Sequence, residues 1–237
     1  MSQFVYGKNV IKQILTSPDV ILEVYLASED KEVLKVCREN KIPCHILSKK
    51  ELSKLSKSKH HQGYVVKRKD YPTYPLEELI AQKKSEHGLL ILLDEMEDPH
   101  NLGAILRTAD AIGADGVIFK KNHAVGLTPT VAKVSAGAID RVKCAEVTNL
   151  TQTANKLKEA GYWFLGADMD GQDYRTLDYD FHVVLVIGNE GKGISRLLRE
   201  TCDYIISLPM VGEMESLNAS VSAGILLYEI NNKRFPI

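Results

Sequence analysis

The sequence predicts an α/β protein of two units, a small N-terminal domain and a larger domain built on a parallel sheet. Two observations lead to this prediction. The first is a set of strands that are apolar on both faces and separated by helical stretches, as is typical of a parallel sheet covered on both sides: Leu89–Leu93, Gly116–Phe119, Trp163–Ala167, Val183–Ile187 and Tyr204–Leu208. The second is the segment Asp70-Tyr-Pro-Thr-Tyr-Pro75, whose prolines favour extended backbone and indicate a linker.

The small domain, expected over residues 1–70, alternates short helices and strands. Its predicted helices are residues 7–16, Lys31–Glu39 and Lys49–Lys57, and its predicted strands are Val20–Leu26, Cys44–Leu47 and Gly63–Lys67. Residues 71–87 are expected to form the linker and the start of the second domain, which occupies residues 88–237.

Composition limits the class of protein. The chain has 237 residues, 44% of them hydrophobic, which is enough for a globular core. We expect a cytosolic protein with no membrane partner, because no stretch approaches the ~20 apolar residues of a membrane span and the first residues lack a secretory pattern. The four cysteines show no Cys-x-x-Cys pair or metal-ligand spacing, so we expect buried free thiols and no metal site.

Charge is unevenly distributed along the chain. Residues 41–69 hold nine Lys/Arg and one acid, or +8, while the remaining residues carry −9. A nucleic-acid backbone is the partner that such a segment fits, although an ordinary solvated face or a disordered basic loop is the alternative. Lys54, Lys57 and Lys59 are the expected phosphate contacts. His61, within His60-His61-Gln62-Gly63-Tyr64, adds the hydrogen-bonding and stacking groups that RNA recognition uses.

The first of three informative segments is Asp98-Pro-His-Asn-Leu-Gly-Ala-Ile-Leu-Arg107. Asn101 is expected to cap a helix that runs to Ile112 and ends at Gly113. Arg107 falls on the side opposite the apolar stripe, near Gly103 and Ala111, whose small side chains would let a nucleotide or a neighbouring chain approach. The alternatives are a simple cap at Asn101 and a surface ion pair between Arg107 and Asp110.

The second segment is Gly188-Asn-Glu-Gly-Lys-Gly-Ile-Ser195, whose glycines permit a tight turn before a helix beginning near Ile194. Its spacing is neither G-x-G-x-x-G nor a P-loop, and Glu190 would repel a phosphate. A neutral or cationic ligand therefore fits better, with a plain glycine-rich turn as the alternative.

The third segment is Leu208-Pro-Met-Val-Gly-Glu-Met-Glu-Ser-Leu-Asn-Ala-Ser220. Pro209 and Gly212 shape a loop, and Ser216-Leu217-Asn218 opens a helix rich in small residues, including Ala219, Ser220, Ala223 and Gly224. All three segments begin at the carboxyl ends of predicted strands, where doubly wound sheets bind their ligands.

In order, spacing and flanking strands, the three segments resemble those of the SpoU-type (TrmH family, SPOUT superfamily) RNA 2′-O-ribose methyltransferases. The resemblance is clear from Leu89 to Tyr228 and weaker in Tyr6-Gly7-Lys8-Asn9-Val10 and His61-Gln62-Gly63. It implies an L30e-like N-terminal substrate domain, a deep C-terminal trefoil knot in which the third segment passes through the loop of the second, and a homodimer. The small residues of the last helix fit a close contact between subunits.

The resemblance also implies a cofactor and a set of site residues. S-adenosylmethionine would be contacted, largely by backbone groups, at Ala167, Gly188, Leu208 and Leu217. The residues expected around the reacting ribose are Asn101, Arg107, Glu190, Ser216 and Asn218. A guanidinium rarely loses its proton, so we expect Arg107 to bind a phosphate and stabilise developing alkoxide charge rather than act as a base, which leaves the proton acceptor open.

An L30e-like domain and a chain that stops soon after its last helix are typical of the RlmB-like branch, which methylates a guanosine ribose in 23S ribosomal RNA. A tRNA ribose methyltransferase and a non-catalytic RNA-binding member of the same fold are the alternatives. An NAD-dependent Rossmann enzyme is disfavoured by the missing G-x-G-x-x-G. Glu213 and Glu215 make the third loop acidic, so they either face a neighbouring subunit or tune substrate choice.

Overall fold

A computed structural model describes residues 2–236, apart from the side chains of residues 2 and 13, and divides the chain into two compact units between Tyr71 and Pro72. The first unit has a four-stranded sheet of order β1-β4-β2-β3, in which only β2 and β3 are parallel. Its elements are β1 (Ser2–Tyr6), α1 (Lys8–Ile14), β2 (Ile21–Leu26), α2 (Lys31–Glu39), β3 (Cys44–Ile46), α3 (Lys49–Ser56) and β4 (Tyr64–Lys69).

Local sequence explains where these helices begin. The Asp30 side chain accepts hydrogen bonds from the first turn of α2, and Ser48 forms a capping box with Glu51 at the start of α3. One face of the sheet packs against α1 and α2 in a single core, with members that include Val5, Ile11, Val24, Val33 and Val66. Strand β1 was missed by the sequence prediction because it has only five residues at the start of the chain.

The second unit contains a six-stranded sheet of order β10-β8-β9-β5-β6-β7, and every adjacent pair is parallel, as predicted. The strands are β5 (Leu89–Leu93), β6 (Gly116–Lys120), β7 (Cys144–Val147), β8 (Tyr162–Asp173), β9 (His182–Ile187) and β10 (Tyr204–Ser207). The helices are α4 (Leu76–Ala81), α5 (Pro99–Ala111), α6 (Pro129–Ser135), α7 (Leu150–Glu159), α8 (Arg196–Arg199) and α9 (Ala219–Arg234).

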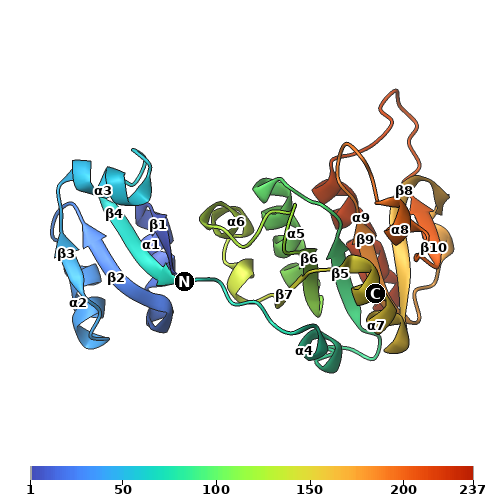
Figure 1. Cartoon of the computed structure of the whole chain (residues 1–237), viewed down its shortest axis with the longest axis horizontal. Coiled ribbons are helices and arrows are strands. Elements are labelled where there is room, and N and C mark those ends of the chain that lie inside the picture. The colour runs from blue at the N-terminus through green and yellow to red at the C-terminus, as the bar shows by residue number, and fades with distance from the viewer. Residues whose placement is uncertain (1, 237) are drawn as a thin grey trace. The chain divides into compact units, whose positions relative to one another are not determined.

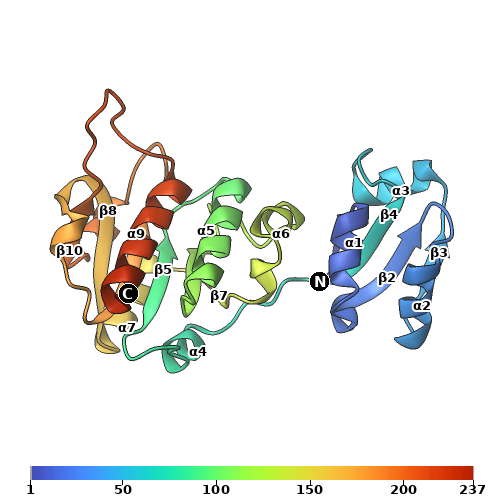
Figure 2. The same cartoon turned by 180° about the vertical axis from the view of Figure 1, so that it is seen from behind.

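Helices cover both faces of this sheet (Figures 1 and 2). Helices α4, α7 and α8 pack on one face around a core that includes Leu90, Ile118 and Phe164. Helices α5, α6 and α9 lie together on the other face. None of the helices within residues 2–236 has the length and apolar character needed to cross a bilayer.

Two strands differ from the sequence prediction. Strand β7 was not predicted, since it is short and includes the polar Glu146. Strand β8 was expected to end at Ala167 but continues to Asp173 as a polar extension that pairs with β10 after a register irregularity at Ile205 and Ile206. The extension has no apolar run, so hydrophobic patterning could not detect it.

Candidate functional site

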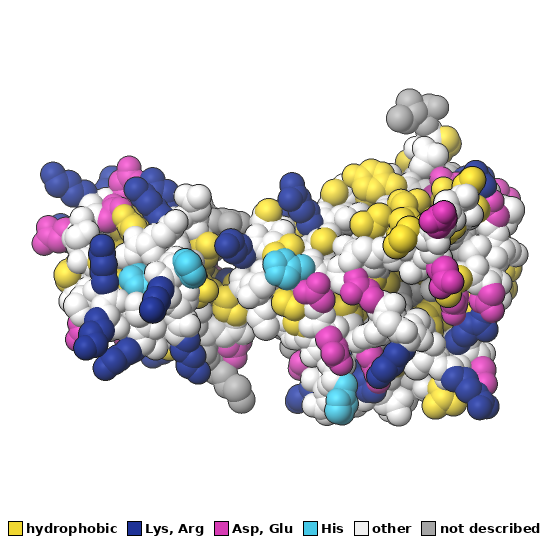
Figure 3. All heavy atoms as spheres, turned by 90° about the horizontal axis from the view of Figure 1, so that it is seen from above, with side chains coloured by type: hydrophobic (Ala, Val, Ile, Leu, Met, Phe, Trp, Pro, Cys, Tyr) yellow, Lys and Arg dark blue, Asp and Glu magenta, His cyan; other side chains and the backbone are white. Residues whose placement is uncertain are grey.

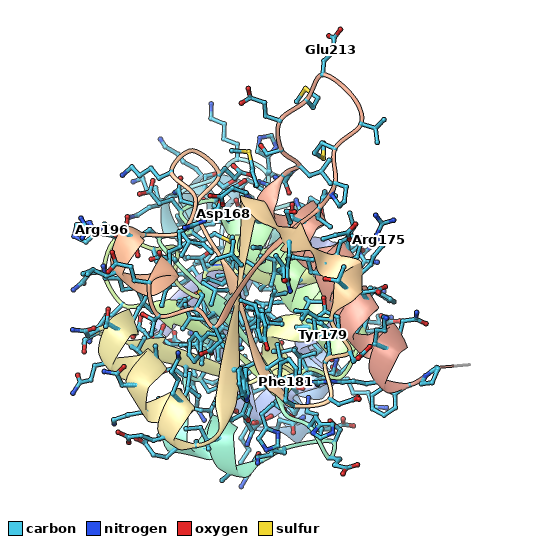
Figure 4. All side chains as sticks on the ribbon, turned by 90° about the vertical axis from the view of Figure 1, so that its right-hand side faces the viewer. Asp168, Arg175, Tyr179, Phe181, Arg196 and Glu213 are labelled. Atoms are coloured by element: carbon cyan, nitrogen blue, oxygen red, sulfur yellow. The ribbon has the colours of Figure 1, made fainter. Side chains whose placement is uncertain are left out.

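A cavity of about 300 Å³ lies at the carboxyl ends of β9 and β10, beside the middle of β8. Because the strands are parallel, the loops that follow β9 and β10 meet at one edge of the sheet. The walls come from the middle of β8, the loop after β9, the loop after β10 and the first turns of α9. Its lining residues include Ala167, Asp168, Gly188, Glu190, Leu208, Ser216, Leu217 and Ser222. Figure 4 shows this end of the sheet, with Asp168 near the upper rim and Glu213 at the tip of the loop after β10.

Gly188 begins the loop after β9, and no larger residue fits there. A Cβ at Gly188 would overlap the backbone of Gly193, which itself has a positive φ of 67°. The backbone groups of Asn189 and Gly193 exchange two hydrogen bonds of 3.0 and 2.8 Å. The Asn189 side chain accepts from the amide of Gly191 and donates to the carbonyl of Glu95. The loop is therefore a closed turn fixed to the segment after β5.

Asp94 supports the same loop and was missed by sequence reasoning. It is buried, and its carboxylate accepts a 2.7 Å hydrogen bond from the backbone amide of Ser195. Its own amide donates to the carbonyl of Ile187 across the sheet. The sequence did contain a signal for this role, because Asp94 directly follows the all-apolar strand β5. A carboxylate at such a buried position is expected to have hydrogen-bond partners.

Three polar side chains, one from each segment, meet beside the cavity. The amide nitrogen of Asn101 donates to Glu190 Oε1 at 2.8 Å, and the amide nitrogen of Asn218 donates to Asn101 Oδ1 at 3.0 Å and also to Glu190 Oε1. Asn218 Oδ1 caps α9 by accepting from the backbone amides of Ser220 and Val221. The network fixes both amides and leaves one carboxylate at the cavity wall.

Asn101 is not the cap that we expected. Asp98 caps α5, accepting from the amide of His100 at 2.8 Å, and Pro99 occupies the first turn. Asn101 therefore lies inside the helix, buried, with its side chain free for the network. The predicted end of the helix is confirmed, because Ile112 is its C-cap and Gly113 follows with a φ of 70°.

Arg107 is exposed, as predicted, but it does not line the cavity of its own chain. It lies six residues after Asn101, which places it about 9 Å further along α5 and on another side of the helix. Among residues 2–236 it has no hydrogen-bond or ion-pair partner, because Asp110, the alternative partner, binds Arg141 at 2.6 Å. One chain alone therefore does not bring this cation to the cavity.

The other predicted ribose and cofactor residues do converge. Ala167, Gly188, Leu208 and Leu217 all line the cavity, together with Glu190 and Ser216. Asn101 and Asn218 join them through the shared hydrogen bonds. Asp168, on the rim, accepts from Arg199 at 3.1 Å, and the carboxylates of Asp168 and Asp170 raise the pKa of that guanidinium.

The expected RNA contacts of the first unit divide into two groups. Lys54, Lys57 and Lys59 are all exposed, on α3 and in the loop that follows. His61 is buried, which corrects the prediction that it stacks with RNA. Its Nδ1 accepts from the amide of Gly63 at 3.0 Å and its Nε2 lies 3.1 Å from the hydroxyl of Ser53, so the ring holds the loop in place.

Three of the small residues that we expected at a surface, Gly103, Ala219 and Ala223, are instead packed inside the chain. Gly103 packs against α6, where an added Cβ would lie 2.6 Å from the Cβ of Val134. Ala219 and Ala223 are buried on the inner face of α9. The outer face of α9 instead exposes Val221, Ile225 and Tyr228, which are 48%, 37% and 56% accessible.

Comparisons with known proteins agree with this geometry. Residues 88–228 match the sequence model of the SpoU rRNA Methylase family, and residues 4–74 match that of RNA 2′-O ribose methyltransferase substrate binding. YacO of Bacillus subtilis (strain 168), assigned to the TrmH family of tRNA/rRNA methyltransferases, is 42% identical over 99% of this chain and 97% of its own. The chain therefore belongs to the SpoU rRNA methylase family.

Two solved structures are informative. The SpoU methyltransferase AviRb from Streptomyces viridochromogenes, in complex with S-adenosylmethionine (AdoMet), has a TM-score of 0.83 and 25% identity over 98% of this chain and 90% of its own. The TrmH/SpoU tRNA modifying enzyme of A. aeolicus has a TM-score of 0.58 and 30% identity, and covers 67% of this chain and 80% of its own. The protein is an S-adenosylmethionine-dependent RNA methyltransferase.

The cavity fits this cofactor chemically. Its walls combine apolar side chains such as Leu208 and Leu226 with the backbone groups of a tight glycine turn. Glu190 gives the wall a carboxylate, which suits a cationic sulfonium and would disfavour a phosphate. Within residues 2–236, no group of three or more His, Cys, Asp or Glu side chains is arranged to hold a metal ion.

Proposed function

We propose that the protein transfers a methyl group from S-adenosylmethionine to the ribose 2′-hydroxyl of a guanosine in 23S ribosomal RNA. The observation that carries this proposal is the network of Asn101, Glu190 and Asn218, which joins all three sequence segments at the wall of the cofactor cavity. The match of residues 4–74 to a substrate-binding family supports an RNA substrate that also contacts the first unit.

The residues of the site contribute binding and orientation. When bound, S-adenosylmethionine supplies the methyl group on its sulfonium. We assign its binding to Ala167, Gly188, Leu208 and Leu217, and the placing of the ribose to Ser216 and the Asn101–Glu190–Asn218 network. Holding a 2′-hydroxyl in line with a bound methyl group can supply ~7–11 kcal/mol of rate enhancement. The Arg107 guanidinium binds the adjacent phosphate and stabilises the negative charge that develops on the ribose oxygen.

Ribosomal RNA is favoured over tRNA by domain organisation. The tRNA modifying enzyme of A. aeolicus covers only 67% of this chain, whereas the AdoMet-bound rRNA methyltransferase of Sinorhizobium meliloti, 24% identical, covers 97% of it. YacO is named as a tRNA/rRNA methyltransferase, so a tRNA substrate is the alternative. The cytoplasm is the compartment in which either RNA would be met.

The test is a map of ribose methylation across ribosomal RNA and tRNA from a deletion strain and from the same strain with the gene restored. We expect one guanosine of 23S RNA to lose its methyl group in the deletion strain and regain it on restoration. Loss of a tRNA methyl group instead would replace the proposed substrate, and an unchanged map would contradict the proposal.

We also infer that the active unit is a homodimer with the C-terminal knot that the resemblance implies. Two observations support this inference. Arg107 has no part in the cavity of its own chain, so a neighbouring chain is the way to bring it to a cofactor. Helix α9, which lines that cavity, exposes the hydrophobic side chains of Val221, Ile225 and Tyr228. Figure 3 shows hydrophobic side chains gathered on the surface of the second unit.

Sedimentation tests the dimer. The wild type should sediment at about twice the 26.4 kDa chain mass. Ile225→Arg should produce a folded monomer that has lost methyl transfer, because it places a charge in the inferred interface. Leu197→Arg, at a more exposed apolar residue of α8, is the control and should remain dimeric. A fully active wild-type monomer would contradict the shared site.

A further inference from the structure

Helices α1 and α2 cover one face of the first unit's sheet, and α3 packs against β1 and β4 on the other face, where Val65 is fully buried. The rest of this second face is partly exposed. Side chains alternate along a strand, and Val5, Val24, Cys44 and Val66 point into the core with α1 and α2. Their neighbours Phe4 on β1, Tyr25 on β2, His45 on β3 and Lys67 on β4 therefore lie on the opposite face. Strand pairing places Phe4 directly beside Lys67, and Tyr25 directly beside His45.

The three rings on this face form a continuous row across the sheet. The Tyr25 and His45 rings are stacked, with centroids 5.3 Å apart and planes at 25°, and the Phe4 and Tyr25 centroids are 6.2 Å apart. Phe4 and Tyr25 are half-buried and His45 is exposed. Aromatic faces of this kind on a four-stranded sheet are what single-stranded RNA uses for base stacking.

Glu23, on the same face of β2 as Tyr25, holds Tyr25 and Lys67 in place and lies near His45. Its carboxylate accepts from the Tyr25 hydroxyl at 2.6 Å and from the Lys67 ammonium at 2.6 Å, and it lies 3.6 Å from His45 Nε2. The hydrogen bonds from Lys67 and Tyr25 lower the pKa of this carboxyl, so it remains charged. The rings are thereby oriented before any ligand arrives, and the charges of Lys67 and Glu23 cancel.

The positive charge around the row of rings favours a polyanionic ligand. Residues 1–71 hold 14 Lys/Arg and 8 Asp/Glu, a net charge of +6. Figure 3 shows Lys and Arg side chains over the surface of this unit. Lys69 lies on the same face as the rings by strand alternation, and it is exposed. A surface that combines a row of rings with a cationic surround is complementary to a polyanion whose bases are unpaired.

We propose that the face formed by Phe4, Tyr25 and His45 is a base-stacking subsite for a single-stranded segment of the substrate RNA. This inference rests on the proposed function. It assigns to the rings a part of the substrate RNA that differs from the part bound by the lysines. The exposed Lys54, Lys57 and Lys59 hold phosphates, whereas the rings hold bases. The two surfaces differ in salt dependence, because stacking on a locally neutral row releases few counterions.

The chain offers a closely matched pair of variants. Tyr25 and Tyr64 are both half-buried strand residues of the first unit, and each hydroxyl donates to a carboxylate, Glu23 at 2.6 Å and Asp30 at 2.8 Å. Tyr64 lies on the core face of the sheet, beside α1 and α2. Tyr25→Leu and Tyr64→Leu therefore remove the same groups from opposite faces, and Tyr25→Phe keeps the ring.

Binding of a labelled single-stranded RNA of mixed sequence to the full chain is the measurement, with an RNA duplex of the same length for comparison. We expect Tyr25→Leu to weaken single-strand binding about 5- to 100-fold, as expected for the loss of one stacked base, without changing the dependence on salt. Tyr64→Leu should change it no more than about twofold, and Tyr25→Phe should keep most of it.

Three results would overturn the inference. These are equal affinities of Tyr25→Leu and wild type, a wild type that prefers the duplex, and a Tyr25→Leu variant that changes the oligomeric state alone, which would make the face an interface between copies. Methyl transfer by the wild type is measured in parallel. If the wild type methylates ribosomal RNA and Tyr25→Leu binds normally, only the subsite fails. If the wild type transfers no methyl group to any RNA, the proposed function fails.

Discussion

The two units of this chain differ in charge and in the kind of surface that they present. The first carries +6, with exposed lysines on and after α3 and a row of rings on its sheet, whereas residues 72–237 carry −7 and form the cofactor cavity. An anionic catalytic unit attracts RNA poorly by charge, so a cationic unit joined to it must supply that attraction. The comparison indicates a division of labour in which one unit binds the polyanion and the other performs methyl transfer.

The largest expected effect lies in the second unit. Arg107→Ala should reduce methyl transfer by ~10²–10³-fold or more while cofactor binding is kept, because it removes a cation aimed at developing charge. Lysine should restore little, since a point charge cannot reproduce a planar fork. The rate of transfer at saturating RNA is the measurement.

Arg141→Ala is the matched control for Arg107, as both are exposed arginines near Asp110 and Arg141 has a surface ion pair. It should behave almost as the wild type, because such pairs contribute little. Near wild-type turnover of Arg107→Ala would remove Arg107 from the site.

The next effect separates two glycines of the cofactor loop. Gly188→Ala should weaken binding of S-adenosylhomocysteine at least ~10-fold, because its Cβ would overlap the backbone of Gly193. Gly191→Ala should bind nearly normally, since its Cβ would meet only Asn189 Oδ1, at 3.6 Å. Calorimetry measures the affinity of each variant for S-adenosylhomocysteine. Equal affinities for the two variants would show that the closed turn does not shape the cavity.

A smaller effect is expected in the first unit. Replacing Lys54, Lys57 and Lys59 with alanine should weaken RNA binding and reduce the slope of log affinity against log salt by about 0.7–0.9 for each phosphate that a lysine no longer neutralises. Lys12 and Lys35 serve as the control, because Glu32 and Glu39 already oppose their charges. An unchanged slope in the triple variant would mean that the basic segment is only solvated.

The smallest effect concerns the thiols. Burial raises the pKa of Cys37, Cys144 and Cys202 to about 12, so few thiolates exist near pH 8 in either unit. The stabilisation from keeping them neutral is present below pH ~9 and declines as pH rises from there toward 12. Labelling with a thiol reagent should be slow until denaturant opens each unit, and rapid labelling of native Cys144 would contradict this burial.

The sequence predicted features that depend on local patterning. Apolar runs identified strands such as β5 and β9, and the three segments identified the cavity because parallel strands bring their ends together. It misassigned residues whose role depends on distant partners. Asn101 is a residue type that often caps helices, yet Asp98 takes that role and Asn101 forms a hydrogen bond with Glu190, 89 residues away. His61 is a residue type that often contacts RNA, yet its two ring nitrogens form hydrogen bonds with Ser53 and Gly63.

Small residues show the same limit. Composition marked α9 as suited to close packing, but only the three-dimensional structure shows that Ala219 and Ala223 face the chain's own core while Val221 and Ile225 face outward. Strand alternation on the first sheet could have suggested the row of rings. Its order, β1-β4-β2-β3, is needed to bring Phe4, Tyr25 and His45 together.

The division of labour is tested most directly by steady-state methyl transfer to ribosomal RNA over a range of RNA concentrations, comparing the Lys54, Lys57 and Lys59 triple variant with Arg107→Ala. If the first unit only binds RNA, the triple variant should raise KM for RNA and keep the wild-type kcat, whereas Arg107→Ala should lose kcat. A triple variant with a wild-type KM and a reduced kcat would place the first unit in the chemistry and contradict the division of labour.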